Sequence, residues 1–136
     1  MLSRDDNETL VRVGPGTAMG RLMRLYWLPF LRAADVEADG QPHRVRLLGE
    51  DLVAFRDTGG RVGLVDHACP HRGAPMVFGR NEDDGLRCVY HGWKFSVDGQ
   101  CRDMPAEPAN TPMCSRMKIK AYPVRDFFSN PEKAYF

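Results

Sequence analysis

A chain of 136 residues has room for one domain of ordinary size, which disfavours a two-domain enzyme. Hydrophobic residues make up 43% of it and charged residues 27%, so it is neither disordered nor collagen-like. A formal net charge of +1 provides no field that would gather nucleic acid or an anionic membrane, and the apolar run at 26–31 is too short to cross a bilayer. We therefore expect no nucleic-acid partner and no membrane partner.

The first 16 residues are polar, which predicts a mobile arm. They also lack the basic and apolar segments of a secretory signal, which predicts a cytoplasmic protein. After them Thr17 is a candidate helix N-cap. Met19, Leu22, Met23 and Tyr26 follow at i, i+3, i+4 and i+7, so they share one face of a short helix that ends before Pro29. We expect this apolar face to lie on the protein's own core.

Beyond the helix, short runs of valine, leucine and phenylalanine alternate with turn residues, which is typical of a small all-β fold. Strands are predicted at 44–48, 52–56, 62–65, 86–90, 94–97, 100–104 and 117–124. Glycine-containing turns at 49–51, 58–60 and 98–99 would join them as antiparallel hairpins, and 105–112 is predicted to be irregular because it holds three prolines. The expected fold is an antiparallel β structure preceded by a short helix.

Cysteine and histidine alternate in two short motifs, Cys69-Pro70-His71 and Cys88-Val89-Tyr90-His91, which together read C-x-H-x16-C-x-x-H. Thiolate and imidazole donors select a transition metal over calcium or magnesium. Zinc fingers group two cysteines first and two histidines later, whereas here each half holds one of each, so the pattern favours an iron–sulfur centre. A zinc-stabilised binding domain is the alternative.

These loops and their flanks, Cys69 to Gly73 and Cys88 to Phe95, resemble the Rieske family, whose [2Fe-2S] cluster has two cysteines on one iron and two histidines on the other. The resemblance implies a Rieske-type antiparallel fold with a cluster-binding subdomain. It also implies that Cys69 and Cys88 hold the inner iron and that His71 and His91 hold the outer one. The residues expected around the cluster are Arg72, Tyr90, Gly92 and Trp93.

The leader before residue 44, with its helix and Tyr26-Trp27-Leu28-Pro29, is similar to the N-terminus of ring-hydroxylating oxygenase large subunits of the phthalate and phenoxybenzoate type. That resemblance implies one-electron transfer from a reductase or ferredoxin, through the cluster, to a mononuclear-iron catalytic domain or subunit that hydroxylates an aromatic ring. It leaves homo-oligomeric assembly open. A stand-alone Rieske ferredoxin or redox module is the alternative.

A mononuclear iron site of this type needs two histidines and a carboxylate, and the chain has only four histidines. Two of these are committed to the cluster, while His43 and His67 are expected to make polar or solvent contacts. We therefore expect no catalytic residue in the chain and only the electron-transfer part of an oxygenase. The remaining cysteines, Cys101 and Cys114, are expected to be free thiols.

The expected organisation has three parts. An N-terminal arm and helix occupy 1–30, the Rieske domain occupies 31–125 with its cluster-binding subdomain at about 66–105, and a tail occupies 126–136.

Overall fold

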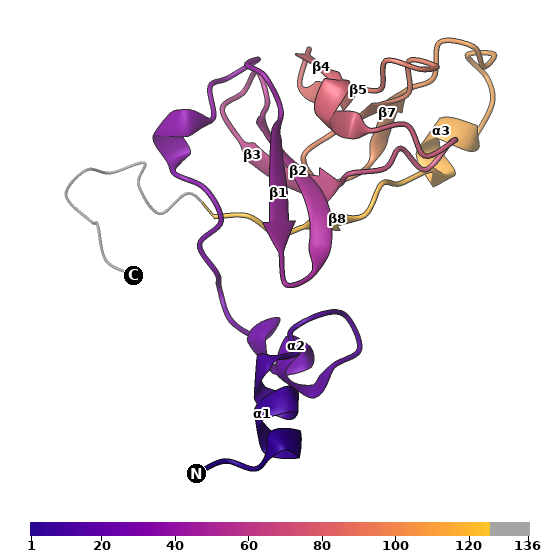
Figure 1. The fold of residues 1–136 in the computed structure, drawn as a ribbon. Coiled ribbons are helices and arrows are strands. Elements are labelled where there is room, and N and C mark those ends of the chain that lie inside the picture. The colour runs from indigo at the N-terminus through magenta and orange to yellow at the C-terminus, as the bar shows by residue number, and fades with distance from the viewer. Residues whose placement is uncertain (126–136) are drawn as a thin grey trace.

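Two four-stranded antiparallel sheets form the body of the protein, whose computed structural model describes residues 1–125 (Figure 1). The first sheet has the order β1-β2-β3-β8 and the second has the order β4-β5-β6-β7. The strands are β1 (His43–Leu47), β2 (Glu50–Arg56), β3 (Val62–Asp66), β4 (Arg80–Glu82), β5 (Gly85–Arg87), β6 (Lys94–Phe95), β7 (Cys101–Asp103) and β8 (Ala121–Tyr122). The expected antiparallel β fold is therefore confirmed.

The main core lies between the two sheets. Val53 and Phe55 of β2 and Val65 of β3 pack with Leu86 and Phe95 of the second sheet, and all five are fully buried. Each buried side chain of this kind stabilises the fold by roughly 1.5–3 kcal/mol relative to an exposed one. A smaller cluster on the other face of the first sheet holds Val45, Leu52, Ala54 and Leu64. Both faces of the central strand β2 are therefore covered.

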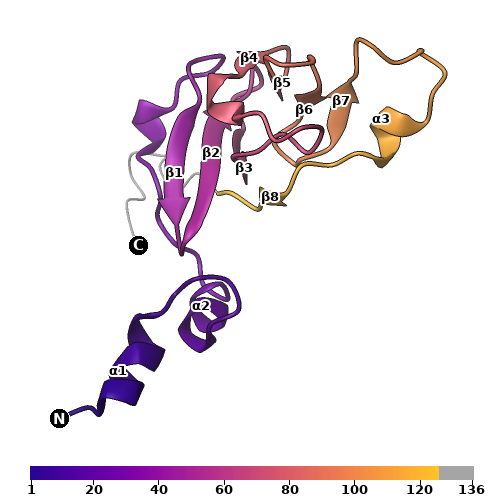
Figure 2. The ribbon, with the colours of Figure 1, turned by 45° about the vertical axis from the view of Figure 1, so that its right-hand side comes forward.

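The N-terminal segment contains two helices, α1 (Arg4–Val11) and α2 (Ala18–Met23), which lie apart from the sheets (Figure 2). The prediction that this arm lacks structure was wrong for α1, because Ser3 caps it by accepting a hydrogen bond from the Asp6 backbone N–H. Thr17 caps α2 as predicted, accepting from the Gly20 N–H. Elsewhere the chain has short helical turns at η1 (Ala33–Asp35), η2 (Met76–Phe78) and α3 (Met113–Arg116).

The prediction that α2 buries an apolar face on the core was also wrong. Gly20 is the one buried residue of α2, and Leu22 and Tyr26 are 46% and 67% exposed. A Cβ at Gly20 would lie 2.2 Å from the Gly14 carbonyl oxygen, so α2 packs on the backbone of the preceding turn instead of on the core. Hydrophobic periodicity identified the helix but not what its apolar face would contact.

The helical segment is joined to the first sheet through Arg24 and Glu50. Arg24 donates to the Leu48 carbonyl at 3.1 Å and to Glu50 at 2.8 Å. Glu50 also accepts from Lys120 and, at 2.6 Å, from the Tyr122 hydroxyl. One half-buried carboxylate thereby connects the N-terminal segment, β2 and the C-terminal strand β8.

Several strand boundaries differ from the prediction. The strand predicted at 86–90 ends at Arg87, because the next residues turn into a loop. The short β4 was missed, as was α3, and the strand predicted at 117–124 is reduced to β8, where Leu64 pairs with Tyr122. No helix within residues 1–125 is both long and apolar enough to span a membrane. The predicted tail, 126–136, lies outside the described residues.

Candidate metal centre

The first candidate loop, residues 69–74, follows β3 and precedes η2. The backbone N–H of Cys69 donates to the Ala74 carbonyl at 2.9 Å, and the N–H of Gly73 donates to the Cys69 carbonyl at 2.8 Å. Gly73 has a φ of 72°, in the left-handed region that glycine tolerates best. The loop thereby folds back on its own cysteine and holds it against the core.

The second loop, residues 88–93, connects β5 to β6 and repeats this pattern. The N–H of Cys88 donates to the Trp93 carbonyl at 2.9 Å, and the N–H of Gly92 donates to the Cys88 carbonyl at 3.1 Å. Gly92 has a φ of 77°. In both loops the cysteine is therefore bonded to the fourth and fifth residues after it, although the spacing to the histidine differs by one residue.

The two cysteines meet in the core. Cys69 is 2% exposed and Cys88 is 3% exposed. Burial raises the pKa of the Cys69 thiol to about 11, and the adjacent Cys88 adds to the rise, while the backbone N–H groups of His71 and Arg72 oppose it. Without a metal the Cys69 thiol would stay protonated at neutral pH, and metal binding would displace its proton.

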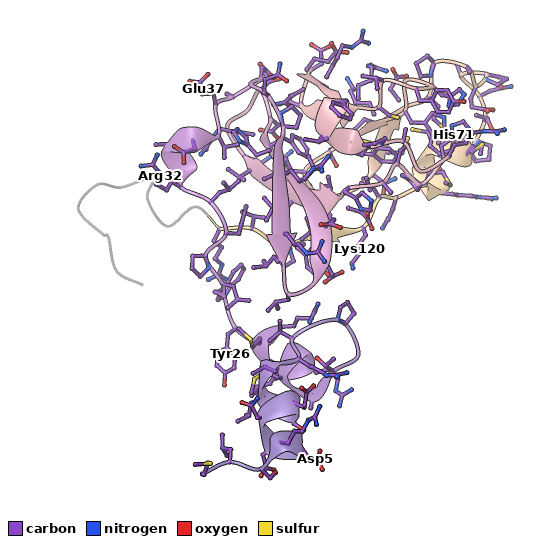
Figure 3. The ribbon with its side chains drawn as sticks, viewed as in Figure 1. Asp5, Tyr26, Arg32, Glu37, His71 and Lys120 are labelled. Atoms are coloured by element: carbon purple, nitrogen blue, oxygen red, sulfur yellow. The ribbon has the colours of Figure 1, made fainter. Side chains whose placement is uncertain are left out.

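The two histidines meet at the outer side of the same site. Their ring centroids are 4.5 Å apart with an interplanar angle of 67°. His71 is half-buried and stacks on Trp93 at 4.3 Å and 8°, whereas His91 is exposed and lies 3.9 Å from the exposed ring of Tyr90. Figure 3 places His71 at the upper right of the molecule, well away from the N-terminal helices. The donors are therefore arranged as an inner thiol pair and an outer imidazole pair.

His71 Nδ1 provides the test of whether these residues fit a metal. This nitrogen is buried and has no hydrogen-bond partner. Burial lowers the pKa of His71, as do nearby His91 and Arg72, while Glu107 has the opposite effect. A neutral imidazole with a free buried nitrogen is the form that binds metals. Soft thiols beside such a nitrogen suit the irons of a mixed Cys/His cluster.

Within the described part of the chain, no group of three or more His, Cys, Asp or Glu side chains is placed to hold a single metal ion. In a cluster of the mixed type each iron takes only two protein ligands. Cys69 with Cys88 and His71 with His91 form two pairs that fit this pattern.

Arg87 supports the second loop, and sequence reasoning missed it. Its guanidinium donates to Glu82 at 2.8 Å, to the Gly92 carbonyl at 2.7 Å and to Asp103 at 2.8 Å, and its side chain is only 12% exposed. Burial alone would lower the pKa of Arg87, but these hydrogen bonds raise it overall. Its position directly before Cys88 was the one available signal.

Three residues remain from the sequence analysis, namely Arg72, His43 and His67. Arg72 is exposed and contributes its backbone N–H rather than its charge to the Cys69 environment. His43 begins β1, and the half-exposed His67 has its Nδ1 3.2 Å from an Asp66 carboxylate oxygen. Neither of these two histidines joins the pair at the centre, as predicted.

Comparison with known proteins finds one matching domain family and several similar enzyme subunits. The family described as the Rieske [2Fe-2S] domain matches residues 26–123. The chain is 54% identical to the 3-chlorobenzoate-3,4-dioxygenase oxygenase subunit of Comamonas testosteroni, over 89% of this chain and 28% of that protein. It is 50% identical to the phthalate 4,5-dioxygenase oxygenase subunit of Pseudomonas putida, over 93% of this chain and 29% of that protein. The chain thus spans less than a third of the length of these relatives.

Solved structures agree on the fold. A crystal structure of dicamba monooxygenase with non-heme iron and dicamba matches with a TM-score of 0.65 and 27% identity, over 74% of this chain and 30% of that one. The reduced complex between oxygenase and ferredoxin in carbazole 1,9a-dioxygenase matches with a TM-score of 0.62 and 27% identity, over 74% and 26% of the two chains. The Rieske-type fold and the [2Fe-2S] cofactor expected from the two loops are therefore confirmed.

Proposed function

Because this chain belongs to the Rieske [2Fe-2S] domain family, we propose that it is the electron-transferring part of an aromatic-ring-hydroxylating oxygenase. The observation that carries the proposal is the pair of matched loops, which bury Cys69 and Cys88 together and bring His71 and His91 together outside them. The similarity to oxygenase subunits named for 3-chlorobenzoate and phthalate supports the aromatic context.

In this proposal Cys69 and Cys88 bind the inner iron, and His71 and His91 bind the outer iron. When bound, the cluster supplies a carrier that accepts and releases one electron at a time. The buried position of the cysteines excludes water from the sulfur side, and the Cys69 sulfur receives backbone N–H groups that stabilise negative charge. The division into an arm at 1–30 and a domain at 31–125 belongs to the same proposal.

The imidazole pair is the proposed site of electron exchange, since His91 is exposed and in ring contact with His71. The donor would be a reductase or ferredoxin, for which the carbazole oxygenase–ferredoxin complex is the precedent among similar structures. The acceptor would be a mononuclear-iron domain or subunit, in a cytoplasmic protein.

Cluster content tests the ligand assignment. We expect a brown holo-protein with two irons and two sulfides per chain and, after reduction, a rhombic EPR signal of mixed Cys/His ligation. Cys88→Ser should lose the cluster, and Cys101→Ser is the matched control because Cys101 is a buried cysteine outside both loops. A colourless protein with stoichiometric zinc, or loss of the cluster only in the control, would contradict the assignment.

An assay for hydroxylated product tests the proposal that the chain is part of an oxygenase. With a reductase, a reductant and an aromatic acid, the chain alone should cycle its cluster without forming hydroxylated product. Addition of a polypeptide that carries the mononuclear-iron site should restore product formation. Hydroxylation by the chain alone, with catalase present to remove peroxide from uncoupled reduction, would overturn this assignment.

A further inference from the structure

Cys101 and Cys114 are far from each other along the chain but in contact in the fold. Their sulfur atoms lie 2.8 Å apart, and both are free thiols. Cys101 is the first residue of β7 and is 5% exposed, while Cys114 lies in α3 and is half-buried. Neither residue belongs to the two loops of the metal centre, so the proposed electron transfer does not use this thiol pair.

The backbone holds the two thiols together independently of the sulfur atoms. The Gln100 side-chain amide donates to the carbonyls of Ser115 at 3.1 Å and Met117 at 3.3 Å. The backbone N–H of Cys101 also donates to the Met117 carbonyl at 3.1 Å. Because α3 is already fixed on β7, a bond between the sulfurs would demand little rearrangement of the chain. Both views of the ribbon show α3 beside β7 (Figures 1 and 2).

The segment between the two thiols, residues 102–113, borders the metal centre. A Cβ added to Gly92 would lie 3.1 Å from Pro105, so this segment touches the second loop. The carboxylate of Glu107 acts electrostatically on His71. The thiol pair therefore sits where the two ends of this bordering segment come together.

We propose that Cys101 and Cys114 are a redox modification site, a dithiol that a low-molecular-weight disulfide such as oxidised glutathione converts to an intramolecular disulfide. In the oxidised form, the disulfide joins the two ends of the 102–113 segment and restrains this segment beside the metal centre. The ligand pair Cys69/Cys88 takes no part in the reaction.

The exchange proceeds in two balanced steps. Cys114, the more exposed thiol, attacks one sulfur of the oxidant as its thiolate, forming a mixed disulfide and releasing one glutathione thiolate. Cys101 then attacks the Cys114 sulfur, which forms the internal disulfide and releases the second glutathione thiolate. Two electrons pass to the oxidant, and the two protein thiol protons end on the two glutathione molecules.

We expect the internal disulfide to form slowly at neutral pH. In the dithiol, burial is the main cause that raises the pKa of Cys101 to about 12. Cys101 stays buried in the mixed disulfide, although the hydrogen bond with the Cys114 thiol is then lost. Since only the thiolate is a nucleophile, the second step should be slow at neutral pH and faster in mildly alkaline solution. The site thus responds to sustained exposure to a disulfide oxidant.

Peptide mapping tests the proposal directly, because trypsin separates all four cysteines. Cleavage after lysine and arginine places Cys101 in peptide 95–102, Cys114 in 103–116, Cys69 in 62–72 and Cys88 in 88–94. Holo-protein is incubated anaerobically with oxidised glutathione, quenched in acid, alkylated under denaturing conditions and digested. We expect peptides 95–102 and 103–116 to be joined, and dithiothreitol to separate them.

A serine variant, hydrogen exchange and the visible spectrum provide further tests. Cys114→Ser should give no joined peptides, and backbone hydrogen exchange across 104–113 should slow on oxidation of the wild type but not of this variant. The visible spectrum should show that the cluster is retained. Three results would each overturn the proposal. The first is that the two peptides stay separately alkylated at a glutathione dose that oxidises a small-molecule dithiol. The others are a stable mixed disulfide at Cys114 and a link to peptide 62–72 or 88–94. The joined peptides do not depend on the oxygenase context, so the two proposals can fail separately.

Discussion

The first sheet and the metal-binding half of the molecule share one core but differ in how their buried polar groups are satisfied. In the first sheet, Glu50 receives hydrogen bonds from Arg24, Lys120 and Tyr122. The metal-binding side comprises both loops and β4 to β7. Within residues 1–125, the two buried side-chain atoms without a hydrogen-bond partner, His71 Nδ1 and Asn81 Oδ1, both lie on this side.

This difference shows which part of the fold is complete as protein alone. Buried polar groups are almost always paired, because an unpaired one costs about 1–3 kcal/mol. Around the half-buried Glu50, the protein's own side chains meet that requirement. The metal-binding half keeps a free imidazole nitrogen and two shielded thiols next to each other, so we infer that its stability depends on the cluster.

The most extensive expected effect, which spans about forty residues, follows from removing the cluster. We expect amide hydrogen exchange across 66–104 to accelerate by on the order of 10- to 100-fold, since the loss of ligand bonds leaves His71 Nδ1 unpaired at a cost of about 1–3 kcal/mol. Exchange in β1 and β2 should change much less. Hydrogen-exchange mass spectrometry of holo- and apo-protein measures both. Equal acceleration in the two halves would remove the distinction drawn between them.

Glu50→Gln addresses the first sheet. Burial favours the protonated acid, but hydrogen bonds from Lys120, Tyr122 and Arg24 outweigh it and lower the pKa of Glu50 to about 2. Because this pKa lies below the usual 4.5, the carboxylate contributes stability that is fully present above about pH 4.5 and is lost as the pH falls towards 2. We expect the variant to lose roughly 2–3 kcal/mol at pH 7.

Denaturant unfolding at several pH values checks this effect. The stability of the variant should also vary less between pH 4.5 and 2 than that of the wild type. Glu37→Gln is the matched control because Glu37 is exposed, and it should change stability by no more than about 0.5 kcal/mol. An equal loss in both variants would show that the network around Glu50 contributes nothing specific.

Alanine substitutions at the two loop glycines, Gly73 and Gly92, distinguish the cost of backbone strain from the cost of a steric clash. Gly73 and Gly92 both have positive φ values, so alanine at either should cost about 1 kcal/mol in strain. A Cβ on Gly73 meets nothing within 4 Å, whereas one on Gly92 would lie 3.1 Å from Pro105. We expect Gly92→Ala to cost about 1 kcal/mol more than Gly73→Ala. Thermal unfolding of the two holo-proteins decides this, and equal costs would mean that the 102–113 segment yields freely.

The smallest expected effects concern the rings beside the histidines. Trp93 is 4% exposed and stacked on His71, so Trp93→Phe should reduce stability by about 1 kcal/mol through lost burial and stacking. Tyr90 is 62% exposed, so Tyr90→Phe should change stability by less than about 0.5 kcal/mol. Unfolding curves of the two variants test the ranking, and a larger loss for Tyr90→Phe than for Trp93→Phe would show that the buried, stacked ring of Trp93 contributes little.

Local features of the structure were predictable from the sequence when neighbouring residues alone carry them. Thr17 caps α2, and the Asp98-Gly99 pair turns the chain between β6 and β7 with Gly99 at a φ of 80°. The alternation of cysteine and histidine likewise identified the family and the cofactor, because the donor types and their spacing decide which metal centre can form.

Features that depend on contacts across the chain were not predictable. The apolar face of α2 was expected on the core and instead lies exposed, since periodicity marks a face but not its partner. Arg87 showed no periodic signal, yet it joins β4, β7 and the second loop.

Adjacent residues are enough to predict the β-rich fold, the order of the donors and the loops that carry them, because turn formation and donor chemistry are local properties. Contacts between distant parts of the chain decide that the imidazole of His71 is half-buried and stacked on Trp93 while that of His91 is exposed, and that Cys101 meets Cys114. These outcomes depend on how two sheets and a helix pack together. Packing is set by the shape and burial of side chains distant in sequence, which no local pattern records.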